Sequence, residues 1–279
     1  MTIARVRKWG KTSLRYGVLT LFLFIVLLPI VGIFFSAFKS NLEVIQGPFA
    51  PPREWRLDNF VNAWNAGRFG AYFRSSVIVV IPVVLVSVVL STLTGYAFGT
   101  LTFPGQRLLF YTILIGFMVP FEAVVIPLYH MLRGMGLTDT YWALILPQIG
   151  LSVSFGTFWM SSFFRNAPQE LIDAATIDGS SRWQTLWLVL WPLARPAVLT
   201  LVVLLFMWTW NEFLLALVLV QDESVRTLPV GLAFFQGRFT ADIPRLAAGS
   251  LIVAGPILIV YAFFQRHFIR GMLGGSVKG

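Results

Sequence analysis

The sequence contains no cysteine, and only 12% of its 279 residues are charged. Without cysteine the chain can form neither a disulfide framework nor a thiolate metal site. Its two histidines, His130 and His267, lie far apart and have no cluster of ligating side chains near them, so we expect no metal site. The sequence supports a catalytic Ser/His/Asp triad no better than it supports a metal site.

Apolar side chains are abundant instead: they make up 57% of the residues and give a mean hydropathy of +0.78. A soluble domain of this length usually has about twice this charged fraction. An apolar run of roughly 20 residues is long enough to cross the hydrocarbon core of a bilayer as a helix. The sequence therefore predicts an all-α integral membrane protein with six transmembrane helices, at residues 17–38, 75–98, 108–130, 141–164, 196–220 and 246–265.

The basic residues indicate the orientation of these spans. Six spans place both termini on one side, together with twelve Lys and Arg and three carboxylates, whereas the other side has nine basic and seven acidic residues. The positive-inside rule assigns the first side to the cytoplasm. Because this placement accounts for the net charge of +9, we do not expect a nucleic-acid partner. We expect a cytoplasmic tail at 1–16, a membrane domain at 17–265, a second cytoplasmic tail at 266–279, and polar segments 39–74 and 221–245 outside.

Two local patterns modify this arrangement of regular helices. Pro120 and Pro127 lie inside the third span, where a proline removes a backbone donor and kinks or breaks a helix. Gly95 and Gly99 are four residues apart in the second span, a spacing that permits close contact between helices. We interpret this glycine pair as packing within the chain itself.

One polar stretch, ELIDAATIDGSSRWQ, stands between two strongly apolar segments. Pro168 and Glu170 suit the start of a helix, because proline needs no N–H there and the helix dipole stabilises a carboxylate. Gly179 suits its end, since glycine tolerates the left-handed conformation of a C-terminal cap. Ser181 begins an S-x-x-Q capping box that opens a second helix. Residues 165–192 are therefore predicted as helix, glycine turn, helix, on the cytoplasmic side.

Leu171, Ala174 and Ala175 share one face of the first of these helices by their i, i+3, i+4 spacing. The two alanines allow another surface to approach closely, and the carboxylates beside that face can meet basic groups. On these physical grounds alone, a docking helix and a solvated helical loop are equally good interpretations of this segment.

The stretch DAATIDGSSRWQTLWLVLWP resembles the EAA signature of permease subunits in binding-protein-dependent ABC importers, which reads E-A-A, three residues, G, nine residues, I-x-L-P. The alanines, the glycine and Pro192 fall at the required spacing, while Asp173, Val189 and Trp191 replace the family's Glu, Ile and Leu. Four further stretches resemble the carbohydrate branch, and its maltose-type second permease subunit in particular: DTYWALILPQ (139–148), WNEF (210–213), TLPVGLAFFQG (227–237) and GGSVKG (274–279).

This resemblance implies the type I ABC importer permease fold, in which the insert is a coupling helix seated in a groove of a cytoplasmic ATPase. ATP-driven closure of two ATPase subunits then moves the spans between inward- and outward-facing states. The residues that the resemblance assigns to ATPase coupling are Glu170, Leu171, Asp173, Ala174, Ala175, Asp178, Gly179 and Pro192, and it places Lys278 and Gly279 of the tail between the ATPase subunits.

The partners implied in the same way are a second homologous permease subunit, a dimer of ATPase subunits, an extracytoplasmic solute-binding protein and membrane lipid. The chain itself is expected to be neither an enzyme nor a cofactor-binding subunit, with ATP and Mg²⁺ held by the ATPase partners. Its GKT at 10–12 only mimics the end of a phosphate-binding loop, because Arg5 stands where the first glycine belongs. The expected location is the inner (plasma) membrane of a prokaryote.

Two carboxylates fall within predicted spans, where a charge is costly and typically functional. Glu122 and Glu212 come at similar depth when residues are counted along their spans at about 1.5 Å each. Trp208, Asn211 and Glu212 are spaced i, i+3, i+4, so one face of a continuous helix carries all three. An aromatic face stacks on a sugar ring, while an amide and a carboxylate bond its hydroxyls. These four residues are predicted to line the translocation path, and pairing with a neighbouring helix is the structural alternative.

The function predicted from the sequence is the transmembrane permease subunit of an ATP-driven importer for a sugar or sugar derivative delivered by an extracytoplasmic binding protein. The alternatives are a permease for a polyamine, phosphate or an amino acid, and a proton-coupled carrier that uses Glu122 and Glu212 as relays. Such carriers usually contain internal repeats and more spans. An intramembrane enzyme needs convergent catalytic groups, which the polar residues do not supply.

Overall fold

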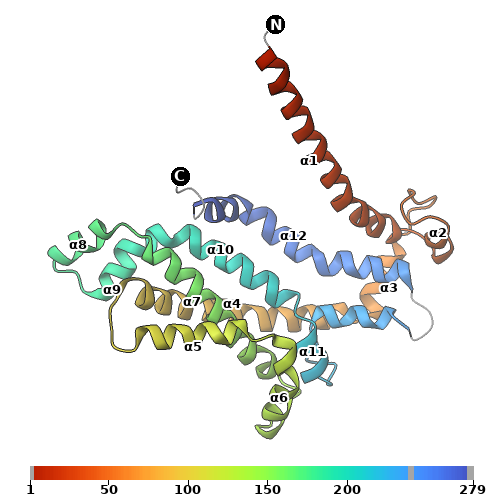
Figure 1. The fold of residues 1–279 in the computed structure, drawn as a ribbon. Helices are drawn as coiled ribbons and strands as arrows, with labels where there is room; N and C mark the ends of the chain where they lie inside the picture. Colours follow the sequence, from red (N-terminus) through yellow and green to blue (C-terminus); the bar gives the residue numbers. More distant parts are fainter. Residues whose placement is uncertain (1–2, 238–241, 275–279) are drawn as a thin grey trace. The chain divides into compact units, whose positions relative to one another are not determined.

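A computed structural model of the chain describes residues 3–237 and 242–274, with side-chain surroundings for 14–237 and 242–265. Within these residues the regular elements are helices (Figure 1). In chain order they are α1 Ile3–Ser36, α2 Asn41–Gln46, α3 Asp58–Ala66, α4 Phe69–Thr100, α5 Gln106–Met118, α6 Phe121–Gly134, α7 Tyr141–Arg165, α8 Gln169–Ile177, α9 Arg182–Gln184, the π-helical η1 Thr185–Leu190, α10 Trp191–Trp210, α11 Leu214–Leu219, the 3₁₀-helical η2 Leu228–Phe235 and α12 Ile243–Gly274.

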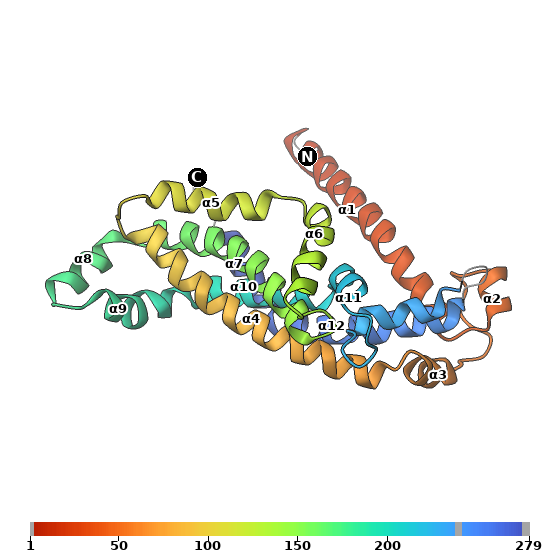
Figure 2. The same cartoon turned by 90° about the horizontal axis from the view of Figure 1, so that it is seen from below.

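Contacts divide the chain into two units. The first is built from residues of Met1–Phe69 and Leu232–Ala254, and the second from residues of Gly70–Gly231 and Gly255–Gly279. In the second unit α8 and α9 lie at one end, and α6 and α11 lie toward the other (Figures 1 and 2). A buried apolar cluster in this unit joins α4, α6, α7 and α11 through side chains that include Val79, Val83, Val125, Leu144, Leu215 and Leu219.

Among the described residues, five helices are long and apolar enough to cross a membrane, and there are six if the bent pair α5–α6 forms one span. The five are Leu14–Ser36, Phe69–Thr100, Tyr141–Arg165, Arg182–Trp210 and Ile243–Gln265. Each of them overlaps one of the predicted spans. The prediction of an all-α, multi-pass membrane protein is therefore confirmed.

The third predicted span, 108–130, is two helices. α5 and α6 meet at Val119 and Pro120 with a bend of 96°. Val119 is extended (φ −68°, ψ 125°), because a proline ring crowds the helical conformation of the residue before it. Pro120 also lacks the N–H that would continue α5. The predicted break is confirmed at Pro120, whereas Pro127 lies inside α6.

The fifth predicted span, 196–220, starts earlier than expected, because the helix already begins at Arg182. It passes through η1, where the Trp191 N–H bonds the carbonyl oxygen of Leu186, five residues earlier. In a regular α-helix, the ring of Pro192 crowds the carbonyl four residues before it. The wider π turn accommodates this proline without ending the helix.

The glycine pair of α4 lies directly against α7. A Cβ added at Gly95 would lie 2.9 Å from backbone atoms of both Met160 and Ser161. At Gly99 it would lie 2.8 Å from the Cβ of Phe164. Real Cβ atoms do not approach so closely, so only glycine permits this helix contact. The prediction that the pair packs within the chain is confirmed.

Asp139 ties the turn before α7 to the segment after α11. Its backbone is left-handed (φ 61°), and its carboxylate accepts N–H bonds from Gln221 and Asp222, the second at 2.9 Å. Its own N–H donates to the carbonyl oxygen of Leu219 at 3.2 Å. Hydrogen bonds to a carboxylate are stronger than neutral ones, so this one residue fixes two chain segments together.

In the first unit, buried polar side chains order the segment that follows α1. The Lys39 ammonium donates to the carbonyl oxygen of Gly47 at 2.7 Å. Asn59 donates to the carbonyl oxygens of Ala37 and Lys39 at 3.0 and 2.9 Å. The polar segment 39–74, which was predicted to lie outside, is thus an ordered structure that contains α2 and α3.

The close approach of α4 and α7 generates a stability prediction. Gly95→Ala forces backbone atoms of α7 to shift, and overpacking of this kind typically costs about 1–3 kcal/mol. We expect a lower thermal unfolding midpoint for the purified protein. Gly150→Ala is the matched control, because a Cβ at that α7 glycine meets no atom within 4 Å. Equal midpoints for the two variants would contradict the proposed contact.

Candidate functional site

The polar insert has the predicted helix–turn–helix form. α8 ends in a turn at Gly179, whose φ of 79° is left-handed. The Ser180 N–H donates to the carbonyl oxygen of Ala175 at 2.9 Å, and the Gly179 N–H donates to that of Thr176 at 3.1 Å. These two bonds define a Schellman cap, so the predicted glycine stop is confirmed. Pro168 stands one residue before α8 as its N-cap and not, as predicted, in its first turn.

The second helix of the insert opens with the predicted capping box. The Ser181 N–H donates to Oε1 of Gln184 at 2.8 Å, and the Gln184 N–H donates to Oγ of Ser181 at 3.4 Å. The two residues therefore satisfy each other's backbone donors. The helix that they start continues without interruption through η1 into α10.

The apolar surface of α8 differs from the predicted face. Ala175 is only 6% exposed, because α8 packs against η1, so this residue is not open to a partner. Leu171 and Ala174 are exposed, in agreement with the prediction. Ile177, which sequence analysis missed, is 86% exposed and lies three residues beyond Ala174. The open surface therefore follows Leu171, Ala174 and Ile177.

The carboxylates predicted beside that face are all at the surface. Glu170, Asp173 and Asp178 are exposed, and none forms an ion pair within the described part of the chain. Asp173 accepts a hydrogen bond from the Gln169 side chain at 2.9 Å. Pro192 is exposed near the start of α10. The predicted tail residues Lys278 and Gly279 lie outside the described residues.

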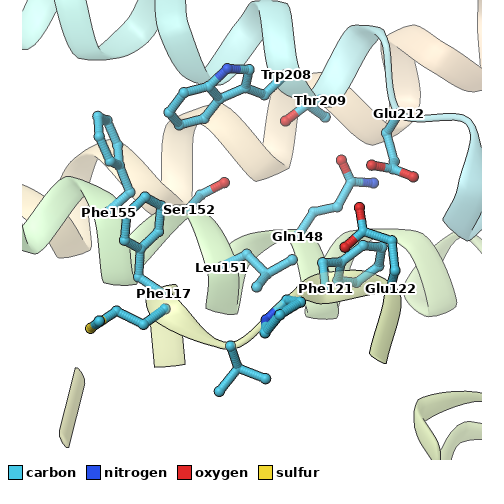
Figure 3. Close-up of a pocket in the computed structure, with 13 residues that line it drawn as sticks. Phe117, Phe121, Glu122, Gln148, Leu151, Ser152, Phe155, Trp208, Thr209 and Glu212 are labelled. Atoms are coloured by element: carbon cyan, nitrogen blue, oxygen red, sulfur yellow. The ribbon is translucent and has the colours of Figure 1, made fainter. Parts of the chain in front are cut away.

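A cavity of about 380 Å³ lies in the second unit, where α5 breaks and α10 ends (Figure 3). Glu122, Trp208 and Glu212 all line it, so the structure brings together three of the four residues predicted for the translocation path. The complete lining is Phe117, Met118, Val119, Pro120, Phe121, Glu122, Gln148, Leu151, Ser152, Phe155, Trp208, Thr209 and Glu212.

The predicted helix face through Asn211 is wrong. α10 ends at Trp210 and α11 starts at Leu214, so Asn211 and Glu212 do not continue the helix of Trp208. The Asn211 amide donates to the carbonyl oxygen of Met207 in its own helix at 3.0 Å, and Asn211 does not line the cavity. Glu212 does, while its Oε1 also accepts the N–H of Leu215 at 2.8 Å and caps α11.

Helix α7 supplies a cavity wall that sequence analysis missed. Gln148, Leu151, Ser152 and Phe155 follow i, i+3, i+4, i+7 spacing and therefore share one face. Phe155 packs edge-on against Trp208 with ring centroids 4.7 Å apart. The sequence feature that could have identified this wall is the pair of polar side chains, Gln148 and Ser152, on one face of an apolar span.

Several membrane-length apolar helices and an exposed helical insert, in a chain whose described elements are helices, define the architecture of a multi-pass membrane protein. A family model described as "Binding-protein-dependent transport system inner membrane component" matches residues 88–274. The chain belongs to this family.

Relatives align over nearly the whole chain. The probable ABC transporter permease protein YurM of Bacillus subtilis is 34% identical over 98% of this chain and 91% of its own length. The diacetylchitobiose uptake system permease protein NgcG of Streptomyces coelicolor is 33% identical over 95% and 89%. The trehalose transport system permease protein SugB of Mycobacterium tuberculosis is 34% identical over 91% and 93%.

A solved structure has the same fold. It is a chain of a bacterial ABC transporter involved in the import of the acidic polysaccharide alginate, and it covers 96% of this chain and 99% of its own length. The TM-score is 0.79 at 23% sequence identity. The expectation of an ABC importer permease fold is thereby confirmed.

Glu212 both lines the cavity and accepts a backbone N–H at the start of α11, and these two roles lead to a prediction. Glu212→Leu removes the carboxylate and the cap, and a lost cap costs about 1 kcal/mol. We expect reduced uptake by a complex that still assembles, and a milder effect of Glu212→Gln, which keeps an acceptor oxygen. Asn211→Ala, next to it but outside the cavity, should change uptake little. Normal uptake by Glu212→Leu, or failure only through lost assembly, would exclude a role in the path.

Proposed function

We propose that this chain is the transmembrane permease subunit of an ATP-driven importer for a saccharide delivered by an extracytoplasmic binding protein. The observation that carries the proposal is the exposed helix α8 at one end of the second unit (Figure 2). A permease subunit that does not hydrolyse ATP itself needs a rigid element that a separate ATPase subunit can move. α8 is rigid because a Schellman turn caps its C-terminal end and Ala175 is packed against η1.

Two observations support a saccharide over another solute. Relatives that are 33–34% identical over most of the chain carry names that assign them to uptake of diacetylchitobiose, arabinooligosaccharides and trehalose. The cavity also combines an indole, two carboxylates and a carboxamide. This combination suits a ring with an apolar C–H face and hydroxyl edges.

The proposed complex contains a second homologous permease subunit and two ATPase subunits that hold ATP and Mg²⁺, whereas this chain binds neither. Both termini and the 165–192 insert lie in the cytoplasm in this assignment. The ATPase contacts the open surface of α8 formed by Leu171, Ala174 and Ile177, flanked by Asp173 and the other exposed carboxylates. Pro192 and the tail residues Lys278 and Gly279 complete the proposed coupling region.

The coupling role is tested at Gly179. Gly179→Val places a β-branched residue at φ 79°, which costs about 1–2 kcal/mol and misdirects α8, although no atom lies within 4 Å of the new Cβ. We expect loss of uptake and of substrate-stimulated ATPase activity in an inserted, assembled complex. Gly179→Asn is the control, because asparagine tolerates the left-handed region and should retain coupling.

A second variant of the insert, Asp173→Lys, reverses one exposed charge without altering the backbone. It should also uncouple ATP hydrolysis from uptake. Normal transport by both Gly179→Val and Asp173→Lys would show that the insert is only a loop. Uptake driven by a proton gradient in a complex without ATPase subunits would instead favour the secondary carrier.

The orientation is tested with single cysteines, which are easily placed because the chain has none. Asn65 is exposed in α3, and we expect Asn65→Cys to react with a membrane-impermeant maleimide added to intact cells. Thr176→Cys, exposed on α8, should react only after permeabilisation. The reverse pattern would contradict the assigned topology.

A further inference from the structure

Three side chains in the cavity wall are more than nine-tenths buried and yet have polar atoms without a partner in the described part of the chain. Gln148, 7% exposed, donates its amide nitrogen to the carbonyl oxygen of Leu144 at 3.0 Å, which leaves its own side-chain oxygen unbonded. The hydroxyls of Ser152 and Thr209, each residue 8% exposed, form no hydrogen bond to a described residue. None of these atoms is among the enclosed, unbonded side-chain atoms of the described residues, so they are open to the cavity and available to a ligand.

The charge of the cavity has one sign. Among the described residues that line it, Glu122 and Glu212 are the charged ones, and no lysine, arginine or histidine stands beside them. Glu122 forms neither an ion pair nor a hydrogen bond with any described residue. Glu212 uses Oε1 on the Leu215 N–H and leaves Oε2 open. Carboxylates and the oxygen of Gln148 only accept hydrogen bonds, so the cavity is complementary to a ligand that donates them.

The two carboxylates and the carboxamide of the lining lie together. Figure 3 shows Glu122, Gln148 and Glu212 gathered on one side with Phe121 beside them, and Phe117, Phe155 and Trp208 on the other side with Ser152. An aromatic wall receives the apolar C–H face of a sugar ring, while the acceptor groups bond the hydroxyls at its edge. The arrangement thus orients a ring as well as holding it.

We propose that this cavity binds an uncharged saccharide through its hydroxyl groups and excludes saccharides that carry a carboxylate. The inference rests on the proposed function and names the class of sugar. A uronate would bring a third negative charge beside Glu122 and Glu212, with no cation in the lining to offset it. The solved chain of the same fold belongs to an importer of an acidic polysaccharide, so the fold itself does not decide the charge of the cargo.

The experiment uses the complete importer in lipid nanodiscs with Ser152→Cys as the only cysteine of this chain. Reaction rates with a cationic and an anionic methanethiosulfonate are compared by mass spectrometry of the chain. We expect the cationic reagent to react at least about tenfold faster, which corresponds to about 1.4 kcal/mol. Ser162→Cys, exposed on the same helix and outside the cavity, is the reference for reagent reactivity.

Two variants assign the preference to the carboxylates. Glu122→Gln, at an exposed side chain that has no partner among the described residues, should reduce the ratio of the two rates without disturbing packing. Glu122→Gln combined with Glu212→Gln should abolish it while the complex still assembles. An equal ratio in the parent and the double variant, or faster reaction of the anionic reagent, would overturn the proposal.

Protection by sugars then tests the cargo. Maltose, cellobiose and trehalose are compared at matched concentrations with digalacturonate and dimannuronate, all without the binding protein. At least one neutral disaccharide should slow modification of the Ser152→Cys thiol, and the uronates should not. Protection by uronates would overturn the proposal, as would absence of any protection in a complex that imports sugar when the binding protein is present. A complex that hydrolyses ATP and imports no saccharide would refute the proposed function instead.

Discussion

Backbone hydrogen bonding is the constraint on which the structure of this chain depends. In lipid, an N–H or carbonyl without a partner is costly, so a helix can stop only where another group replaces the lost bond or where water has access. At the end of α10, the Asn211 amide bonds the carbonyl of Met207 and the Glu212 carboxylate takes the N–H of Leu215. At the end of α5, Pro120 has no N–H that needs a partner. Both of these helix ends border the cavity, so the site lies where the helices are interrupted.

The insert shows which features are predictable from the sequence. Its glycine cap and capping box depend on residues within six positions of one another, so the pattern of Gly179, Ser181 and Gln184 is sufficient to identify them. The burial of Ala175 depends instead on the folding of α8 against η1, which is a contact that helical spacing does not reveal. The same contact leaves Ile177 exposed. Helical periodicity alone cannot tell which of Ala175 and Ile177 becomes buried.

The cavity was predictable only in part, for a related reason. A carboxylate in an apolar span is visible in the sequence, and both Glu122 and Glu212 do reach the cavity. However, neither proline nor glycine marks the end of α10 at Trp210. The assumption of a continuous helix therefore placed Asn211 wrongly on the same face as Trp208. The stretch that begins at Asp139 resembles a family pattern, but its sequence does not reveal what Asp139 contacts. In the structure, its carboxylate accepts hydrogen bonds from two backbone N–H groups more than 80 residues away.

One helical run connects the insert to the cavity. It begins at the Ser181 capping box, continues through α9, η1 and α10, and reaches Trp208, a length of about 40 Å at 1.5 Å per residue. A tilt of α8 and the capping box therefore displaces the indole that lines the cavity, unless the run bends between them. The π turn before Pro192 is the point where bending is easiest, since its hydrogen bonds already depart from the α pattern. The stiffness of this turn then determines how far a movement of the insert changes the shape of the cavity.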